Sequence, residues 1–335
     1  MRLLKLVPDN TNIDFMKWRN LALVLSIIVT IAAIALVAVR GLNLGVDFIG
    51  GQSIRVAFNQ APPLDELRSQ IGALNMGDAT IQESRGAALP GQVARPEVII
   101  RLPLPEGDEA AANRVATQVR GVIQSNYPGA QVLAVDTVSG KVSGELFRSG
   151  AIAIALAMLG IAIYIWFRFE WQFGVGALVT LAHDVAMTMG FFSLTQLEFN
   201  LNVVAAILTL VGYSLNDTVV IYDRIRENLR KYRKMEIVPL LNLSLNETLS
   251  RTIVTSLSIL MALLALLLIG PDVIFGLTAA IFVGIFVGTY SSIYISSPVL
   301  VWLGVSGESF VPKAAQAGAE RVAPKLGKDG DGAQV

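Results

Sequence analysis

The sequence predicts an α-helical membrane protein with six transmembrane helices and an α+β ferredoxin-like (βαββαβ) extracytoplasmic domain between the first two helices. The first observation is composition: of 335 residues, 53% are hydrophobic and only 16% are charged, and the mean hydropathy is +0.59. Soluble domains usually carry about 25% charged residues. The second observation is that charges are frequent in residues 45–148 but nearly absent from six long apolar stretches elsewhere.

Each apolar stretch is long enough to cross a membrane as a helix, which takes about 20 residues. The six are Asn20–Val39, Ser149–Phe167, Phe173–Leu197, Phe199–Tyr222, Thr252–Pro271 and Val273–Gly307. The last is longer than one straight helix needs, and we expect Pro298 to kink or end it. The expected organisation is therefore a cytoplasmic segment (1–19), the first helix (20–40), a periplasmic ferredoxin-like domain (45–148), five further helices (149–304) and a disordered cytoplasmic tail (305–335).

The distribution of Lys and Arg predicts how the chain is oriented in the membrane. These residues gather in the N-terminal segment, in residues 224–234 and in the tail, whereas the short connections Thr195–Asn200 and Gly270–Asp272 contain none. Loops rich in Lys and Arg stay in the cytoplasm. We therefore expect both termini to be cytoplasmic and the domain at 45–148 to lie outside.

Residues 45–148 show alternation typical of strands and spacing typical of helices. Expected strands are Gly51–Phe58, Ala79–Glu83, Glu97–Leu102 and Gln131–Val138; expected helices are one that begins at Pro62–Glu66 and one over Asp108–Asn126; residues Gly86–Arg95 are expected to form a hairpin loop. The order βαββαβ predicts a ferredoxin-like sandwich. Such a fold serves many functions, so it does not identify one.

Several functional classes are excluded by composition. The chain has no cysteine and a single histidine, so it offers no disulfide, no thiolate nucleophile and no multi-His metal cluster. Its formal net charge is zero, which gives no electrostatic reason to expect a nucleic-acid partner. No nucleophile–base pair or cofactor motif is present. We therefore expect no cofactor, no metal and no enzymatic activity.

Four ionisable residues in or beside the apolar stretches are candidates for function: His183, Asp184, Asp217 and Arg251. Charged groups inside a membrane are costly and usually functional. Helical spacing places Tyr213 on the same face as Asp217. A carboxylate here could bind and release a proton, or it could be a fixed hydrogen-bonding group between helices. Arg251 could reach it from the next helix, although a cation at that position is also expected from orientation alone.

His183 and Asp184 lie near the middle of the third apolar stretch. Neighbouring residues on a helix point about 100° apart, so at most one of the two faces a given neighbouring helix. The pair could relay protons, or it could form interhelical hydrogen bonds, and the residues alone favour neither. The last apolar stretch carries a small residue at every fourth position, which allows close approach of another helix. These residues are Gly276, Ala280, Gly284, Gly288, Ser292 and Ser296.

Four segments together resemble a known family. They are Gly45–Gly51, which contains Asp47, Phe48, Gly50 and Gly51; Ala182–Asp184; Gly212–Asn228, which contains Tyr213, Asn216 and Asp217; and Asn246–Ser256, which contains Arg251 and Thr255. The pattern resembles the SecF family of bacterial protein export, the smaller of the paired SecD/SecF families. The resemblance covers almost the whole chain, through about Leu303.

The resemblance implies membership of the resistance-nodulation-division superfamily, whose members couple proton flow to movements of outer domains. It implies a pseudo-symmetric assembly of twelve helices with SecD, association with the SecYEG channel in the bacterial inner membrane, and use of the proton motive force to help move unfolded preproteins outward. By residue, it implies that Asp217 responds to protons and that Arg251 is its charged partner. The segment Gly45–Gly51 would join the first helix to the outer domain. Two alternatives remain at this point: a scaffold that only stabilises the channel, and a half-unit of a small-molecule proton antiporter.

Overall fold

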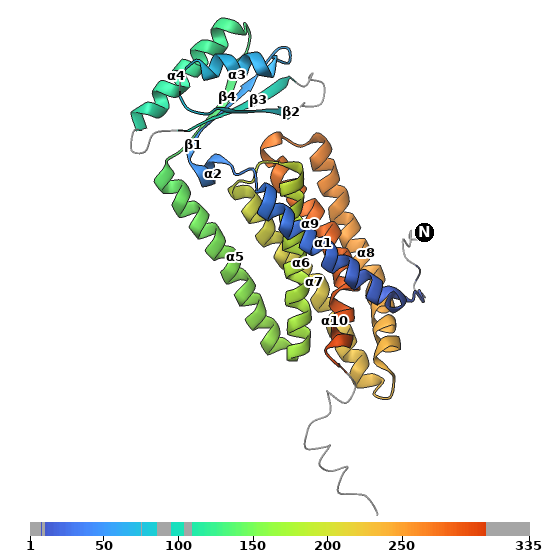
Figure 1. The fold of residues 1–335 in the computed structure, drawn as a ribbon. Helices are drawn as coiled ribbons and strands as arrows, with labels where there is room; N and C mark the ends of the chain where they lie inside the picture. The colour runs from blue at the N-terminus through green and yellow to red at the C-terminus, as the bar shows by residue number, and fades with distance from the viewer. Residues whose placement is uncertain (1–7, 9–10, 75, 86–94, 104–108, 306–335) are drawn as a thin grey trace, which may run out of the picture.

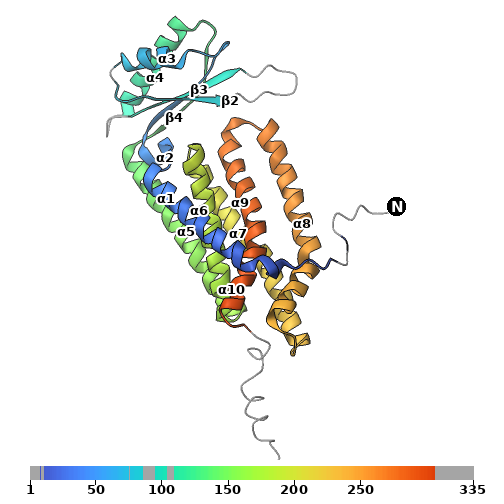
Figure 2. The same ribbon diagram turned by 45° about the vertical axis from the view of Figure 1, so that its right-hand side comes forward.

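The computed structural model describes residues 8, 11–74, 76–85, 95–103 and 109–305 of the chain (Figure 1). The expected hairpin loop at 86–95 and the expected tail therefore lie almost wholly outside the described residues. A helical bundle carries a small α/β domain at one end, and Figures 1 and 2 show the domain beyond the end of α1 and the start of α5.

The outer domain has the predicted βαββαβ order, and its four-stranded antiparallel sheet has the order β2-β3-β1-β4. The elements are β1 (Gly51–Ala57), α3 (Leu64–Gly72), β2 (Thr80–Arg85), β3 (Pro96–Leu102), α4 (Glu109–Asn126) and β4 (Gln131–Val138). Ile54 and Ile100 on the sheet pack against Leu67 of α3 and Val119 of α4 in one apolar core. This core confirms that the alternating apolar positions form the inner face of a sandwich.

Among the residues that the structure describes, six helices are long and apolar enough to cross a membrane, which confirms the predicted number. The bundle consists of η1 (Phe15–Trp18), α1 (Arg19–Arg40), α5 (Gly140–Arg168), α6 (Trp171–Thr195), α7 (Leu201–Lys231), α8 (Ile237–Ile269), η2 (Asp272–Ile274), α9 (Phe275–Tyr294) and α10 (Ser296–Trp302). In the most apolar window of α6, of α7 and of the α9–α10 segment, half of the residues are buried; in α1, α5 and α8 the share is 22%, 11% and 17%. Helices α6, α7, α9 and α10 therefore form the centre of the bundle.

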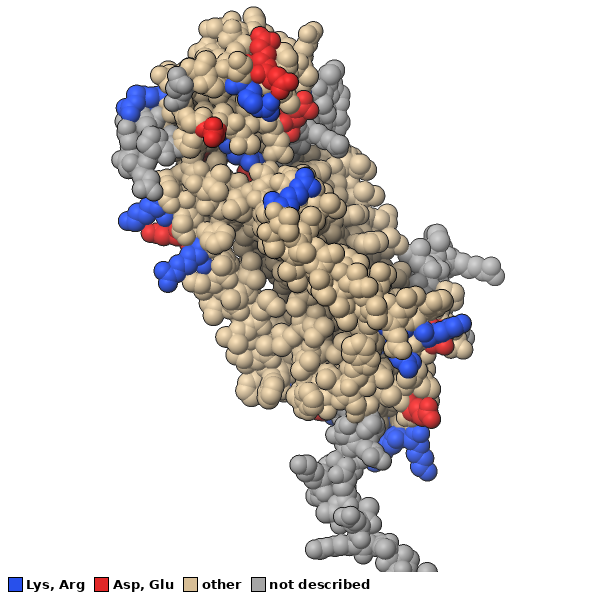
Figure 3. Space-filling model, viewed as in Figure 1, with Lys and Arg blue, Asp and Glu red and all other residues tan. Residues whose placement is uncertain are grey.

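Three helices extend beyond the apolar stretches that predicted them. α5 begins at Gly140 rather than near Ser149, α7 continues to Lys231, and α8 begins at Ile237 rather than at Thr252. Hydropathy marks only the part of a helix that suits the hydrocarbon, and a helix can continue into water with charged side chains. Figure 3 shows the result on one face: an almost uncharged band separates charges on the outer domain from charges at the far end of the bundle.

The last apolar stretch is broken, as Pro298 predicts. α9 ends at Tyr294 and α10 begins at Ser296. Proline lacks the N–H that would bond to the carbonyl of Tyr294, and its ring clashes with that carbonyl, so the helix breaks just before it. The small-residue row on α9 packs against α7: a Cβ on Gly284 would lie 2.5 Å from Leu210, and one on Gly288 would lie 3.4 Å from Ser214. This row is thus an interface within the bundle.

A short connection joins α1 to the sheet. It contains the small helix α2 (Val46–Ile49), which the sequence did not predict, followed by Gly50 and Gly51 with φ of 72° and 115°. A Cβ on Gly51 would lie 2.5 Å from the carbonyl oxygen of Leu102, and one on Gly50 would lie 3.1 Å from Gly140. Both positions therefore require glycine, for conformation and for close backbone approach.

The crossing of α1 and α6 offers a test of packing in the bundle. A Cβ on Gly190 would lie 2.6 Å from Cβ of Ala33 and 3.1 Å from its Cα. We predict that Gly190→Ala destabilises the protein by about 1–3 kcal/mol, because two helix backbones must move apart. Gly160→Ala on α5, where nothing lies within 4 Å, is the matched control and is expected to be neutral or slightly stabilising. Thermal unfolding in detergent measures both, and equal effects would contradict the packing.

Candidate functional site: a polar seam in the helix bundle

Polar side chains from four helices meet in the centre of the bundle, and we call this group the polar seam. Its members are Asp184 of α6, Tyr213, Ser214 and Asp217 of α7, Thr252 and Ser256 of α8, and Thr289 and Ser292 of α9. The two aspartates are buried, with exposed fractions of 1% for Asp184 and 9% for Asp217. Polar groups in a membrane must find partners inside the protein, which explains why these side chains gather.

Asp217 connects three helices through its carboxylate. Thr252 of α8 donates a hydrogen bond to Oδ1 at 2.9 Å, and Ser292 of α9 donates to Oδ2 at 2.8 Å. A hydroxyl can donate to a carboxylate and can also accept from a protonated carboxyl group. The same two neighbours can therefore satisfy Asp217 in either protonation state, which is what a reversible proton-binding site needs.

Asp184 forms a second, fully buried layer. Ser214 of α7 donates to Oδ2 at 2.5 Å, and Nδ1 of His183 lies 3.0 Å from Oδ1. Gly288 of α9 lies against this carboxylate, since a Cβ there would be 3.5 Å from Oδ2. His183 and Asp184 thus contact each other, and Asp184 also contacts the neighbouring helix α7. Ser214 and Asp217 are three residues apart on α7, so the two carboxylates lie about one helical turn apart along that helix.

Three side chains with hydroxyl groups lie beside the two carboxylates. The Tyr213 hydroxyl is 3.3 Å from Oγ of Ser256, and Thr289 donates to the same Oγ at 2.8 Å. Hydroxyls of this kind can each pass a proton from acceptor to donor position. The seam therefore consists of three neighbouring hydrogen-bonded clusters, around Asp184, around Asp217 and around Ser256.

Three predicted site residues lie away from the seam. Arg251 is exposed, and within the described part of the chain it makes no ion pair with Asp217; its attraction to that carboxylate acts over a longer distance. Asn216 is also exposed, and the Thr255 hydroxyl donates to the carbonyl oxygens of Arg251 and Thr252 in its own helix. These three residues are therefore exposed on the outside of the bundle and are not part of its centre.

The segment Gly45–Gly51 also finds specific partners. Asp47 accepts a hydrogen bond from the backbone N–H of Leu201 at 2.9 Å, at the first residue of α7. Phe48 packs against Phe147 of α5 and Phe199, with ring centroids 5.9 Å apart in each case. The connection to the outer domain is therefore fastened to the start of the helix that carries Asp217.

Comparison with known proteins places this arrangement in a family. The model of "Protein export membrane protein SecD/SecF, C-terminal" matches residues 118–306, and that of the "SecD/SecF GG Motif" matches residues 35–62. The chain belongs to the SecD/SecF family. Members of this family are protein export membrane proteins, so the chain is a multi-pass transport protein and not an enzyme.

Individual members of the SecD/SecF family agree over most of the chain. Protein translocase subunit SecF of Rickettsia rickettsii is 42% identical, with 89% of this chain and 94% of that protein covered. The subunit of Cereibacter sphaeroides is 43% identical, with 90% and 93% covered. The crystal structure of SecDF from Thermus thermophilus, described as a translocon-associated membrane protein, matches with a TM-score of 0.80 and 34% identity; the match covers 89% of this chain and 39% of that chain.

A second SecDF crystal structure, in a super-membrane-facing form, matches with a TM-score of 0.64 at the same 34% identity, and the match covers 93% of this chain.

The sequence identified Asp217 as a candidate site residue but did not identify Thr252, Ser256 and Thr289 as members of the polar seam. It left open whether Arg251 contacts Asp217, and the structure turns the adjacent Thr252 face of α8 inward while Arg251 is exposed. The available signal for the two residues of α8 was the four-residue spacing of the hydroxyl side chains Thr252 and Ser256; the small-residue row on α9 does not include Thr289.

The Ser292–Asp217 bond offers a direct test of the seam. We predict that Ser292→Ala lowers the free energy of unfolding by about 1–3 kcal/mol, because it removes a partner from a buried carboxylate. Ser258→Ala is the matched control: its hydroxyl donates at 2.6 Å to Val254 of its own helix, and we expect a change below about 0.5 kcal/mol.

A double-mutant cycle with Asp217→Asn and Ser292→Ala, measured by unfolding in detergent, isolates the interaction. We expect the two changes to deviate from additivity by about 0.5–3 kcal/mol. Strictly additive effects would mean that the two side chains do not interact in the folded protein.

Proposed function

We propose that this chain is the SecF subunit of a SecD–SecF complex that uses the proton motive force to assist preprotein translocation through SecYEG. The observation that carries the proposal is Asp217, a buried carboxylate held by hydroxyls of two neighbouring helices, in a family of protein export membrane proteins. In this proposal the bacterial inner membrane holds the six helices, both termini are cytoplasmic, and the outer domain is periplasmic.

The proton would act through the contacts between α7, α8 and α9. Ionised Asp217 attracts the hydroxyls of Thr252 and Ser292 and, over a longer distance, the guanidinium of Arg251. Protonation removes the charge and weakens these attractions, so the packing of the three helices changes. One charge that crosses 100 mV is worth about 2.3 kcal/mol, which biases a two-state equilibrium about fiftyfold.

Exposed polar residues on the outside of the bundle support the inference that a partner subunit covers it. Asn216, Arg251 and Thr255 are all exposed on membrane-spanning helices. Polar and charged side chains in spans normally face protein or water rather than lipid. Covering by SecD would remove Asn216 and Arg251 from lipid and would bring the Arg251 side of the chain close to a protein-lined proton path. The solved SecDF relative, of which this chain matches 39%, is consistent with such a larger assembly.

The charged end of the bundle fits the proposed cytoplasmic side. Arg168 pairs with Asp223 at 2.7 Å, and Arg224 pairs with Glu247 at 2.7 Å. These ion pairs join α5 to α7 and α7 to α8 just beyond the apolar stretches of these helices. They would anchor one end of the bundle while the packing at Asp217 changes.

Export assays test the proposal most directly. In reconstituted membranes with SecD, SecYEG and SecA, we predict that Asp217→Asn and Arg251→Ala each abolish the part of preprotein export that depends on an imposed proton gradient. Export driven by ATP alone should persist. Glu227→Gln is the matched control, because this carboxylate lies on the same helix but is exposed, and its partner Arg224 keeps its ion pair with Glu247. Unchanged gradient dependence in Asp217→Asn, with normal assembly, would leave a scaffold as the better description.

A further inference from the structure

An ion pair between a buried arginine and a partly buried glutamate joins the outer domain to the helix bundle. Arg101 of β3 is 5% exposed, and its guanidinium donates to Oε2 of Glu198 at 2.5 Å and to Oδ1 of Asn43 at 3.0 Å. Glu198 lies in the connection between α6 and α7, and Asn43 lies in the connection between α1 and the sheet. One side chain of the outer domain thus contacts two separate segments of the membrane part.

The two segments that Arg101 contacts are themselves joined through the backbone. The N–H of Phe199 donates to the carbonyl of Asn43 at 2.8 Å, and the N–H of Gly45 donates to the carbonyl of Phe199 at 2.9 Å. Gly45 lies so close to Glu198 that a Cβ there would be 2.6 Å from Oε1. These bonds make residues 43–47 and 196–201 one unit, which we call the junction.

The junction is joined to both carboxylates of the polar seam through the two helices that begin or end at it, α6 and α7. Its α6 side leads to Asp184, and its α7 side leads to Asp217. On the other side, Arg101 belongs to a strand that is paired on both edges, with Ser53 of β1 and Thr80 of β2 opposite it. A displacement of α7 against α6 therefore moves Glu198, and Glu198 pulls on a residue that cannot move independently of the sheet.

We propose that the Arg101–Glu198 ion pair is the contact that couples rearrangement of the polar seam to movement of the outer domain. The inference rests on the proposed proton-coupled function and assigns a role to two residues outside the proton site. A buried charge is costly without its partner, so the pair resists separation and the sheet follows the junction. Hydrogen bonds between neutral groups would transmit the same displacement less reliably.

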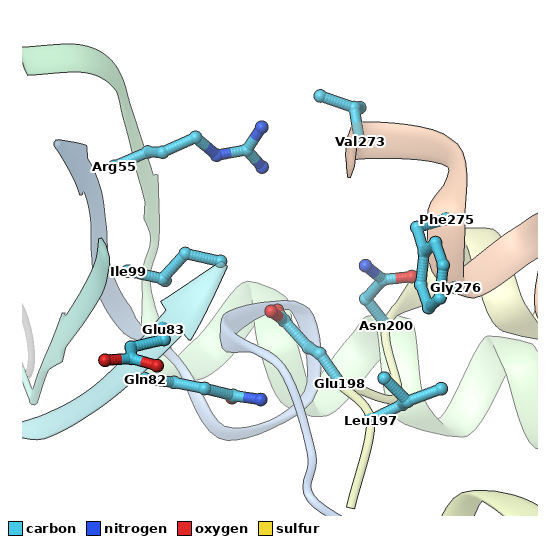
Figure 4. A pocket seen from close by; sticks show the side chains of 10 residues that line it. All are labelled: Arg55, Gln82, Glu83, Ile99, Leu197, Glu198, Asn200, Val273, Phe275 and Gly276. Carbon is cyan, nitrogen blue, oxygen red and sulfur yellow. The ribbon is translucent and has the colours of Figure 1, made fainter. Parts of the chain in front are cut away.

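Space for such a movement lies beside the ion pair. A cavity of about 300 Å³ separates the sheet from the α8–α9 connection, and Figure 4 shows Arg55 of β1 and Glu198 directed into it. Val273 and Phe275 line the opposite wall. Because the domain is held at the ion pair and is open at this cavity, it can tilt about the junction by closing or widening the cavity.

Cross-linking across the cavity measures this tilt. The chain contains no cysteine, so Arg55→Cys with Val273→Cys provides the only thiols in this subunit. In vesicles with a cysteine-free SecD, a bis-maleimide reports how often the two walls approach each other. We expect an imposed proton gradient to change the cross-linking rate, and Glu198→Gln to reduce that response about tenfold, because loss of one charge uncouples the pair. Gradient-dependent export of the cysteine-free chain with Glu198→Gln should fall in parallel.

Control variants separate coupling from general damage. Glu198→Asp keeps the charge and is expected to retain at least half of the response, whereas Arg101→Lys cannot reach both partners and should lower it. Asp65→Asn breaks an exposed ion pair with Arg68 in the same domain and should have no effect. A full response in Glu198→Gln, together with its loss in Asp217→Asn, would overturn the coupling role alone. A full response in Asp217→Asn would overturn the proposed function and the coupling role with it.

Discussion

The hydrogen bonds of the Asp217 carboxylate are the constraint on which the rest of the bundle depends. Ionised carboxylate oxygens only accept hydrogen bonds, so two donors must approach from α8 and α9 at once. Those approaches in turn require small residues on the facing helices, such as Gly284 and Gly288 of α9. The close packing of α7, α8 and α9 and the small-residue row are therefore two consequences of placing one acid inside a membrane protein.

The same constraint explains how a small chemical change can have a distant effect. Hydroxyls of threonine and serine can remain bonded to Asp217 in both protonation states, so the site can change charge without losing its partners. What changes is the strength of attraction between three helices, and two of them, α7 and α8, are also held together by the Arg224–Glu247 ion pair. The junction of residues 43–47 and 196–201 then connects α6 and α7 to the outer sheet through Arg101 and Glu198.

Much of this could be predicted from the sequence, for identifiable physical reasons. Hydropathy predicted six helices because lipid tolerates few charges, and alternation predicted the sheet because one of its faces packs against α3 and α4. Pro298 predicted the break after Tyr294. The partners of Asp217 could not be predicted in the same way, because periodicity describes one helix and not its rotation against others. The Thr252 face of α8, rather than the Arg251 face, turns inward, and only the packing of α7, α8 and α9 decides between them.

Infrared difference spectroscopy of the SecD–SecF complex in lipid would test the central claim, that Asp217 binds and releases a proton within the polar seam. Spectra recorded across a pH titration should contain a band from a buried carboxyl group that gains and loses its proton. We predict that this band is absent in Asp217→Asn and shifts in frequency in Ser292→Ala, because that variant loses one hydrogen bond to the carboxyl group. A band that persists unchanged in Asp217→Asn would show that another group carries the proton and would contradict the account.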